Sequence, residues 1–198
     1  TLYLSFHLQI VLGMPPLEAG LANLPLTLAI MVMAPIATKL LPVIGPRPLL
    51  VVGPLVVAAG LVYLSRITAD GDYLVQVLPG LVLMGVGMAG VFVPLQNLAL
   101  SGVEPQDAGA ASATANSAMQ IGGSIGLSVF TAIYAGVVAA APVAEGASPL
   151  PALTSGYAAI FLAAAIVMAA GSLVAAFLIR GSKSELLPQG DAPVVVHA

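Results

Sequence analysis

Five long apolar stretches, almost free of charge, set the strongest constraint on how this chain can fold. An α-helix rises about 1.5 Å per residue and the hydrocarbon layer of a bilayer is about 30 Å thick, so roughly 20 apolar residues cross it. The stretches that meet this requirement lie near residues 21–41, 48–65, 74–100, 109–138 and 153–179. They are rich in Ala, Gly and Leu and lack the alternating polarity of barrel strands. The chain is therefore predicted to be all-α, a polytopic transmembrane helical bundle.

Composition supports the membrane prediction and argues against other classes. Charged residues make up 7% of the chain and hydrophobic ones 60%, whereas a soluble domain carries about 25% charged residues. The lipid bilayer is thus the expected partner, and the lack of a basic patch argues against nucleic acid. Cysteine is absent, and His7 and His197 lie at opposite ends of the chain, so no metal or cofactor is predicted. No Ser/His/Asp or carboxylate-pair pattern predicts an enzyme.

The chain divides into a membrane part and a tail. Residues 1–180 are predicted to form the transmembrane bundle. Residues 181–198 mix Ser, Lys, Glu, Pro and Gly without periodicity, which predicts a disordered tail. Residues 1–12 are apolar but too short to span, and they lack the basic start of a signal peptide. We therefore expect a truncated first span, and a chain that is a fragment of a longer protein.

Basic residues near the span ends predict the orientation, because cytoplasmic loops carry an excess of Lys and Arg. If the loops alternate, Arg66 alone falls on one side. The basic residues on the other side are Lys39, Arg47, Arg180 and Lys183. This predicts a multi-pass protein of the cell membrane, with loops 42–48 and 101–107 and the C-terminus in the cytoplasm.

Polar residues inside the spans are the candidate functional groups. An unsatisfied amide in an apolar medium costs roughly 2–7 kcal/mol, so each needs water, a ligand or a neighbouring helix. Gln96 and Asn97 follow Pro94 in the third span. One polar face recurs every fourth position in the next span and comprises Ser112, Asn116, Gln120 and Ser124. Two interpretations stay open: these residues line a water-filled substrate cavity, or they hydrogen-bond one helix to another.

Glycines inside the spans predict close helix packing. Gly85, Gly87 and Gly90 match the GxGxxG pattern of dinucleotide sites, but that site needs a strand before it and a helix opening after it. Here the glycines lie within an apolar span, where small residues let helices approach closely. Gly122 and Gly126 predict a second close contact of this kind.

Three motifs follow one another along the chain. The first is Gln9-x-Val11-x-Gly13-x-x-Pro16-x-x-Ala19-Gly20-x-x-x-Leu24-Pro25. The second is Gly45-x-Arg47-x-Leu49-x-x-x-Gly53. The third is Asp107-Ala-Gly109-x-Ala111-Ser112-x-x-x-Asn116, followed by Gln120-x-Gly122-Gly123-Ser124-x-Gly126. In this order they resemble the C-terminal half of fourteen-span drug:proton antiporters of the EmrB/QacA type, which belong to the major facilitator superfamily.

The resemblance implies a C-terminal half of that superfamily's fold and proton-coupled export of drugs or amphiphilic small molecules by alternating access. Its implied partners are a small-molecule substrate, protons and a missing N-terminal half that holds the main coupling acids. The segment with Gly45, Arg47 and Gly53 resembles the cytoplasmic loop motif. The amides of Asn97 and Asn116, with that of Gln120, are expected to orient the substrate.

The sequence also departs from the family pattern. Val43 stands where the loop motif often has a basic residue, His7 where an aromatic is common, and Met119 where relatives are often polar or basic. Two alternatives remain: a metabolite exporter of the same fold, and a non-transporting membrane scaffold subunit. A polar face toward a cavity favours transport, whereas a face buried against neighbouring helices favours the scaffold.

Overall fold

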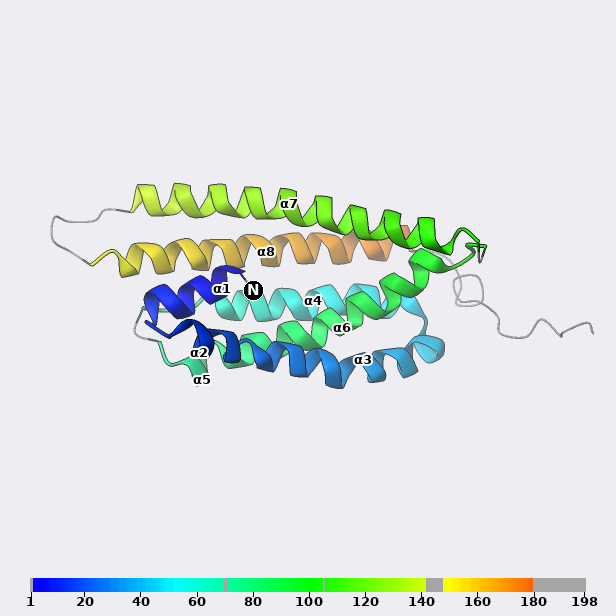
Figure 1. Cartoon of the computed structure of the whole chain (residues 1–198), viewed down its shortest axis with the longest axis horizontal. Coiled ribbons are helices and arrows are strands. Elements are labelled where there is room, and N and C mark those ends of the chain that lie inside the picture. Colours follow the sequence, from blue (N-terminus) through cyan, green and yellow to red (C-terminus); the bar gives the residue numbers. More distant parts are fainter. Residues whose placement is uncertain (1, 70, 105, 142–147, 180–198) are drawn as a thin grey trace, which may run out of the picture.

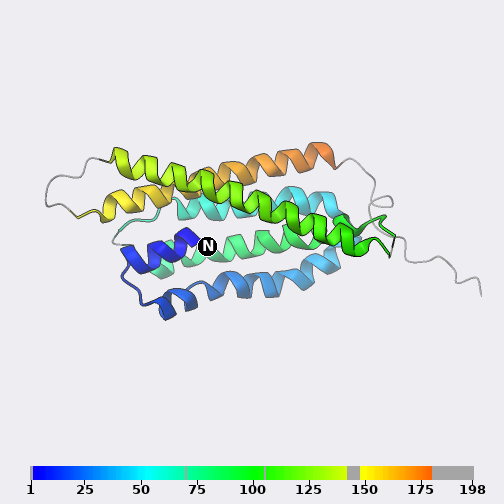
Figure 2. The ribbon, with the colours of Figure 1, turned by 45° about the horizontal axis from the view of Figure 1, so that its top comes forward.

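A computed structural model describes residues 2–69, 71–104, 106–141 and 148–179, and its elements are helices that run side by side (Figures 1 and 2). Within these residues no strand occurs, and five helices are long and apolar enough to cross a membrane. The prediction of an all-α, polytopic bundle is confirmed. The predicted tail, with Arg180 and Lys183, lies outside the described residues.

The chain begins with a short apolar helix in two parts. Helix α1 (Leu2–Phe6) continues into η1 (His7–Val11), a π-helical turn. A turn through Gly13, whose φ is +67°, leads to α2 (Pro16–Leu21). Pro16 suits the first turn of α2, where a backbone N–H has no helical partner.

Two long helices pack face to face in the middle of the bundle. After α3 (Leu24–Ile44) come α4 (Pro46–Leu64), the short α5 (Tyr73–Gln76) and α6 (Leu78–Leu100). Helix α6 lies against both α3 and α4. Helices α4 and α6 are antiparallel neighbours (Figure 1). Glycines near the start of α4 therefore lie opposite the later part of α6, and those near its end lie opposite the start of α6.

The glycines of α6 are the reason that its neighbours approach so closely. A Cβ atom on Gly87 would lie 2.6 Å from the carbonyl oxygen of Gly53 in α4, and one on Gly85 would lie 2.5 Å from that of Leu26 in α3. A Cβ on Gly53 would in turn lie 2.9 Å from the backbone of Gly90. The predicted close packing of the glycines in this span is confirmed.

The last two helices cover one side of the bundle (Figure 2). Helix α8 (Leu150–Leu178) packs on α4, where the Ser172 hydroxyl donates to the Val51 carbonyl at 2.7 Å. Helix α7 (Ala108–Ala140) packs mainly on α8 and buries none of its own residues. The contact uses Gly156 of α8, where a Cβ would lie 2.7 Å from the Tyr134 ring.

The predicted close contact at Gly122 and Gly126 is wrong for the described residues. No atom lies within 4 Å of a Cβ built on Gly122, and for Gly126 the nearest atom belongs to Phe130 of the same helix. The physical reason is that α7 turns another face, with Tyr134 and Val138, toward α8.

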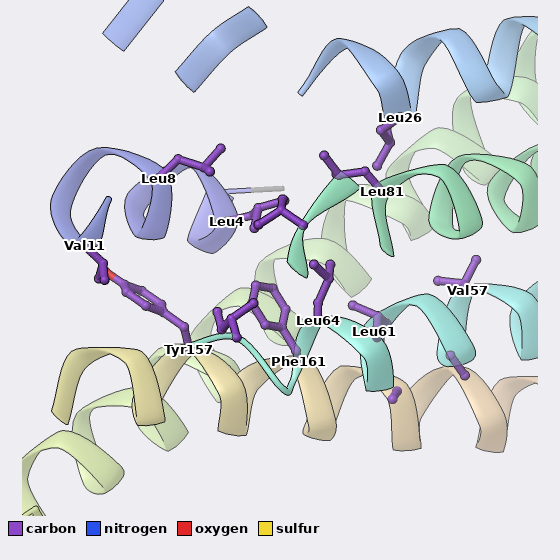
Figure 3. Close-up of a cluster of buried hydrophobic side chains, with 14 of the residues drawn as sticks. Leu4, Leu8, Val11, Leu26, Val57, Leu61, Leu64, Leu81, Tyr157 and Phe161 are labelled. Carbon is purple, nitrogen blue, oxygen red and sulfur yellow. The ribbon is translucent and has the colours of Figure 1, made fainter. Parts of the chain in front are cut away.

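The hydrophobic core lies where α1 and η1 meet α4, α6 and α8 (Figure 3). Leu4 and Leu8 point toward Leu81 of α6, while Tyr157 and Phe161 reach the same region from α8. These side chains are at most 5% exposed. Because these apolar side chains pack against one another, they hold the N-terminal helix against the bundle.

Successive long helices run in opposite directions between the two ends of the bundle. The end of α3, the start of α4, the end of α6, the start of α7 and the end of α8 lie at one end (Figure 1). The end of α4, the start of α6, the end of α7 and the start of α8 lie at the other. Lys39, near the end of α3, and Arg47, near the start of α4, lie at the first end. Arg66, just after α4, lies at the second.

Candidate substrate-binding site

A hollow of about 340 Å³ opens between α6 and α7. Its walls are made by Leu95, Gln96 and Ala99 of α6 and by Ala115, Ala118 and Met119 of α7. The walls are apolar apart from one amide, and the volume lies in the range of small-molecule pockets, about 300–1,000 Å³. This hollow, called the α6–α7 hollow below, therefore offers apolar surface with a single polar contact.

The two predicted site residues on α6 behave differently. Gln96 lines the α6–α7 hollow, and its role as a substrate contact stays a prediction. Asn97 is exposed, and its side-chain amide donates to the Val93 carbonyl of its own helix at 2.8 Å. That bond satisfies one of the two amide N–H groups of Asn97 locally and leaves the other polar positions of the amide available.

The predicted polar face of α7 lies beside the hollow, not in it. Asn116, Gln120 and Ser124 are exposed and Ser112 is half-buried, but none of the four lines the α6–α7 hollow. Successive residues of an α-helix are turned by about 100°, so Asn116 lies one step around the helix from Ala115, which lines the wall. The face winds away from the α6–α7 hollow along the helix.

Neither interpretation of this face is tested by the described contacts. In the part of the chain that the structure describes, the amides of Asn116 and Gln120 have no hydrogen-bond partner. The Ser124 hydroxyl donates to the Gln120 carbonyl one turn earlier, at 2.9 Å. The cavity role of these residues stays a prediction.

The three loop-motif residues connect or contact four helices, α3, α4, α6 and α8. Gly45 has a φ of +82°, in the left-handed region that favours glycine, and it separates α3 from α4. Arg47 donates to the Ala176 carbonyl near the end of α8 at 3.0 Å, where a helix has carbonyls without partners. Gly53 packs against Gly87 and Gly90 of α6. A gating role for the three residues stays a prediction.

A second hollow, of about 380 Å³, was not predicted from the sequence. It lies between the N-terminal helix, α7 and α8, and is called the aromatic hollow below. Its lining residues are Leu2, Tyr3, Phe6, Ile10, Leu127, Thr131, Tyr134 and Tyr157. Three of the chain's 5 Tyr gather here from distant positions in the sequence. No local spacing signals this cluster, because it exists only once the three helices have packed.

His7 lies behind the aromatic hollow and is fully buried. Its ring meets the ring of Tyr157 edge to face, with 5.7 Å between the ring centres. Neither ring nitrogen has a hydrogen-bond partner among the described residues. The His7 ring thus packs on Tyr157 as the ring of a Phe or Tyr would at this position.

No charged residue lines either hollow. The described acidic residues, all exposed, are Glu18, Asp72, Glu104 and Asp107. Across the described ranges, no three His, Cys, Asp or Glu residues come together as metal ligands would. The chemistry that both hollows offer is therefore apolar and aromatic contact with a few neutral hydrogen-bonding groups.

Comparison with known proteins places these features in a family. The family profile of the Major Facilitator Superfamily matches residues 1–127. The puromycin resistance protein pur8 of Streptomyces alboniger is 39% identical over 151 residues, covering 75% of this chain and 30% of the relative. The tetracenomycin C resistance and export protein of Streptomyces glaucescens is 38% identical over 133 residues, covering 67% of this chain and 24% of the relative.

A third relative aligns along nearly the whole chain. The cephamycin export protein CmcT of Amycolatopsis lactamdurans is 32% identical over 197 residues, which are 98% of this chain and 37% of the relative. The chain thus spans between about a quarter and somewhat over a third of the length of these curated relatives. Its helices and the match over 1–127 agree on one conclusion: the chain belongs to the Major Facilitator Superfamily.

Proposed function

We propose that this chain is the C-terminal part of a proton-coupled exporter of drugs or other amphiphilic small molecules, of the fourteen-span EmrB/QacA type. Its relatives are named for resistance to puromycin, resistance to and export of tetracenomycin C, and export of cephamycin. The five membrane-length helices support insertion as a multi-pass protein of the cell membrane. The distribution of Lys39, Arg47 and Arg66 supports a cytoplasmic C-terminus.

The observation that carries this proposal is the apolar α6–α7 hollow beside an exposed polar face. Polar side chains within membrane spans usually face a bundle interior or a water-filled cavity. Asn116 and Gln120 lie exposed on a membrane-length helix, so water or another part of the transporter must cover them. An amphiphilic substrate would place its apolar part in the α6–α7 hollow and its polar part against Gln96 and these amides.

Proton coupling is assigned to the rest of the transporter. The acidic residues of the described helices and loops are exposed, and none is held within the bundle. The remaining two-thirds or so of the protein would supply the coupling acids and the opposing half-bundle. Rocking of the two halves around a site near the middle of the membrane would give alternating access.

Transport by the full-length protein in everted membrane vesicles tests this proposal. With an acidic lumen, vesicles should accumulate amphiphilic dyes, and adding the dye should release protons. Gln96→Ala, Asn116→Ala and Gln120→Ala should change the ratio of transport rates among several dyes, at unchanged protein abundance. Thr114→Ala is the matched control, because its exposed hydroxyl bonds its own helix at Ala110.

The same assay separates the alternatives. Proton-driven movement of polar metabolites but of no amphiphilic dye would replace the drug exporter by a metabolite exporter of the same fold. No proton-driven movement of either class of compound, by protein that is abundant and folded, would favour a scaffold subunit.

A further inference from the structure

Three tyrosine rings from three separate elements form a chain of tilted ring pairs at the aromatic hollow. The ring centres of Tyr134 and Tyr157 are 5.0 Å apart with planes inclined by 30°, and those of Tyr3 and Tyr134 are 6.3 Å apart at 31°. The rings of Phe6 and Tyr3 meet in a T-shaped arrangement, with 6.4 Å between the ring centres and 78° between the planes. These distances fall in the range of favourable aromatic pairs, about 4.5–7 Å. The rings hold one another in place, so the wall is arranged before a ligand arrives.

The rest of the wall is apolar and open. Leu2, Phe6 and Ile10 are 47%, 41% and 52% exposed, and none of the residues that line the aromatic hollow carries a charge. A ligand bound here would therefore bury apolar surface without meeting a counter-ion. A charged group would lose its hydration without compensation, so the hollow favours a ligand that is uncharged when bound.

Two hydroxyl groups at this wall, those of Tyr3 and Thr131, form a hydrogen bond with each other. The Thr131 hydroxyl can donate to the Leu127 carbonyl at 2.7 Å, and its oxygen lies 2.6 Å from the Tyr3 hydroxyl. Either hydroxyl can donate to the other, and the Tyr3 hydroxyl can also donate to the Leu127 carbonyl at 3.4 Å. In both arrangements the Tyr3 proton is used within the protein, and at least one lone pair of the Tyr3 oxygen stays free. A hydroxyl has one proton and two lone pairs. The Tyr3 oxygen therefore keeps the capacity to accept a hydrogen bond from a ligand.

We propose that the aromatic hollow binds a planar, fused-ring aromatic molecule that carries a phenolic hydroxyl. Its ring system would lie against the partly exposed Tyr134, which the buried Tyr157 supports from behind, and its hydroxyl would donate to Tyr3. This inference rests on the proposed function only in taking the ligand to be a transported substrate. The aromatic hollow would then be a second substrate-binding site along α7. Its lining residue Leu127 lies about 12 Å along this helix from Met119, which lines the α6–α7 hollow.

Binding of 1-hydroxypyrene to the full-length protein in lipid nanodiscs tests the proposal, with 1-methoxypyrene as the probe that lacks the donor. Fluorescence anisotropy, corrected with empty nanodiscs, gives both affinities. Tyr3→Phe should weaken binding of 1-hydroxypyrene about fivefold, the usual size of one neutral hydrogen bond, and leave 1-methoxypyrene unchanged. Tyr63→Phe is the control, because that hydroxyl bonds the Val75 carbonyl, away from the aromatic hollow.

A second variant fills the hollow without touching the packed rings. Ile10 is half exposed at its edge, so Ile10→Trp should lower the affinity for both probes at least tenfold while the thermal midpoint stays the same. Unchanged affinity in folded Ile10→Trp would overturn the proposed site. Equal weakening of both probes by Tyr3→Phe would overturn the assigned hydrogen bond and with it the phenolic ligand class.

Transport separates this inference from the proposed function. If the protein binds 1-hydroxypyrene as predicted but transports no amphiphilic dye, the proposed aromatic site stands and the proposed exporter function is overturned. Proton-driven dye transport without detectable 1-hydroxypyrene binding would overturn the aromatic site alone.

Discussion

His7 is the buried side chain whose polar atoms are least satisfied by their surroundings. It is 0% exposed, and both ring nitrogens lack partners in the described part of the chain. Mutational data place the cost of such burial at about 1–3 kcal/mol. The ring itself is well used, because it packs edge-on against Tyr157. The contribution of His7 to stability therefore comes from the packing of its ring, not from its polar nitrogens.

Replacing His7 should separate these two contributions to stability. His7→Phe keeps a ring and removes the unpartnered nitrogens, so the free energy of unfolding should rise by about 1 kcal/mol. His7→Ala leaves a cavity and should lower it by about 3 kcal/mol. Thermal unfolding of the purified full-length protein measures both. A His7→Phe variant as unstable as His7→Ala would mean that the nitrogens have partners elsewhere in the transporter.

Glycines allow the close contact between α4 and α6. In a membrane no hydrophobic effect drives two helices together, so their association depends on close packing at small residues. A Cβ on Gly87 would lie 2.6 Å from a backbone oxygen and 2.7 Å from Val57. Backbone cannot turn aside as a flexible side chain can. Any side chain at this position must therefore push the two helices apart.

Gly87→Ala and Gly122→Ala form a matched pair within the membrane-length helices. Gly87→Ala should lower the free energy of unfolding by about 1–3 kcal/mol through overpacking. Gly122→Ala meets no described neighbour and should raise it by up to about 1 kcal/mol, because alanine favours the helix. Denaturation of the two purified variants in one detergent compares them. Equal effects would show that α4 and α6 are not in close contact.

The long helices follow from sequence because hydropathy alone decides whether a segment can cross a bilayer. The π-helical turn at His7–Val11 and the short α5 carry no such signal. Glycine spacing predicts helix contacts only in part. Gly85 and Gly87 contact other helices, whereas Gly122 and Gly126 contact no other described helix. Spacing identifies a face of small residues, but the neighbour of that face is decided by tertiary packing.

The candidate site shows the same division. The polar face with Asn116 and Gln120 follows from the sequence, because periodicity within one helix is a local property. The role of these residues and of Gln96 at a substrate stays a prediction. The α6–α7 hollow itself, and the local bond of Asn97 to Val93, depend on how the helices lie. The aromatic hollow joins Tyr3, Tyr134 and Tyr157 across most of the chain, so it could not be found from spacing.

The two ends of the bundle differ in their number of basic residues. Lys39 and Arg47 lie at one end and Arg66 at the other, and successive long helices run in opposite directions between these ends (Figure 1). We predict that a reporter fused after Lys183 is cytoplasmic and that one inserted near Glu145 is extracytoplasmic. Paired alkaline phosphatase and fluorescent-protein fusions to the full-length protein measure this. A cytoplasmic reporter at position 145 would contradict the proposed orientation.

If the polar face of α7 lines the path of the substrate, its side chains must be reachable from water and covered when substrate binds, and cysteine labelling measures both. The chain has no Cys, so Asn116→Cys can be made in a full-length protein whose other cysteines are removed, with Thr114→Cys as the control on another face of α7. A membrane-impermeant thiol reagent should label position 116, and a transported dye should slow that labelling while leaving position 114 unaffected. If position 116 resists the reagent in every state of the transporter while Asn116→Ala lowers abundance and keeps selectivity, the face joins helices and does not line the path.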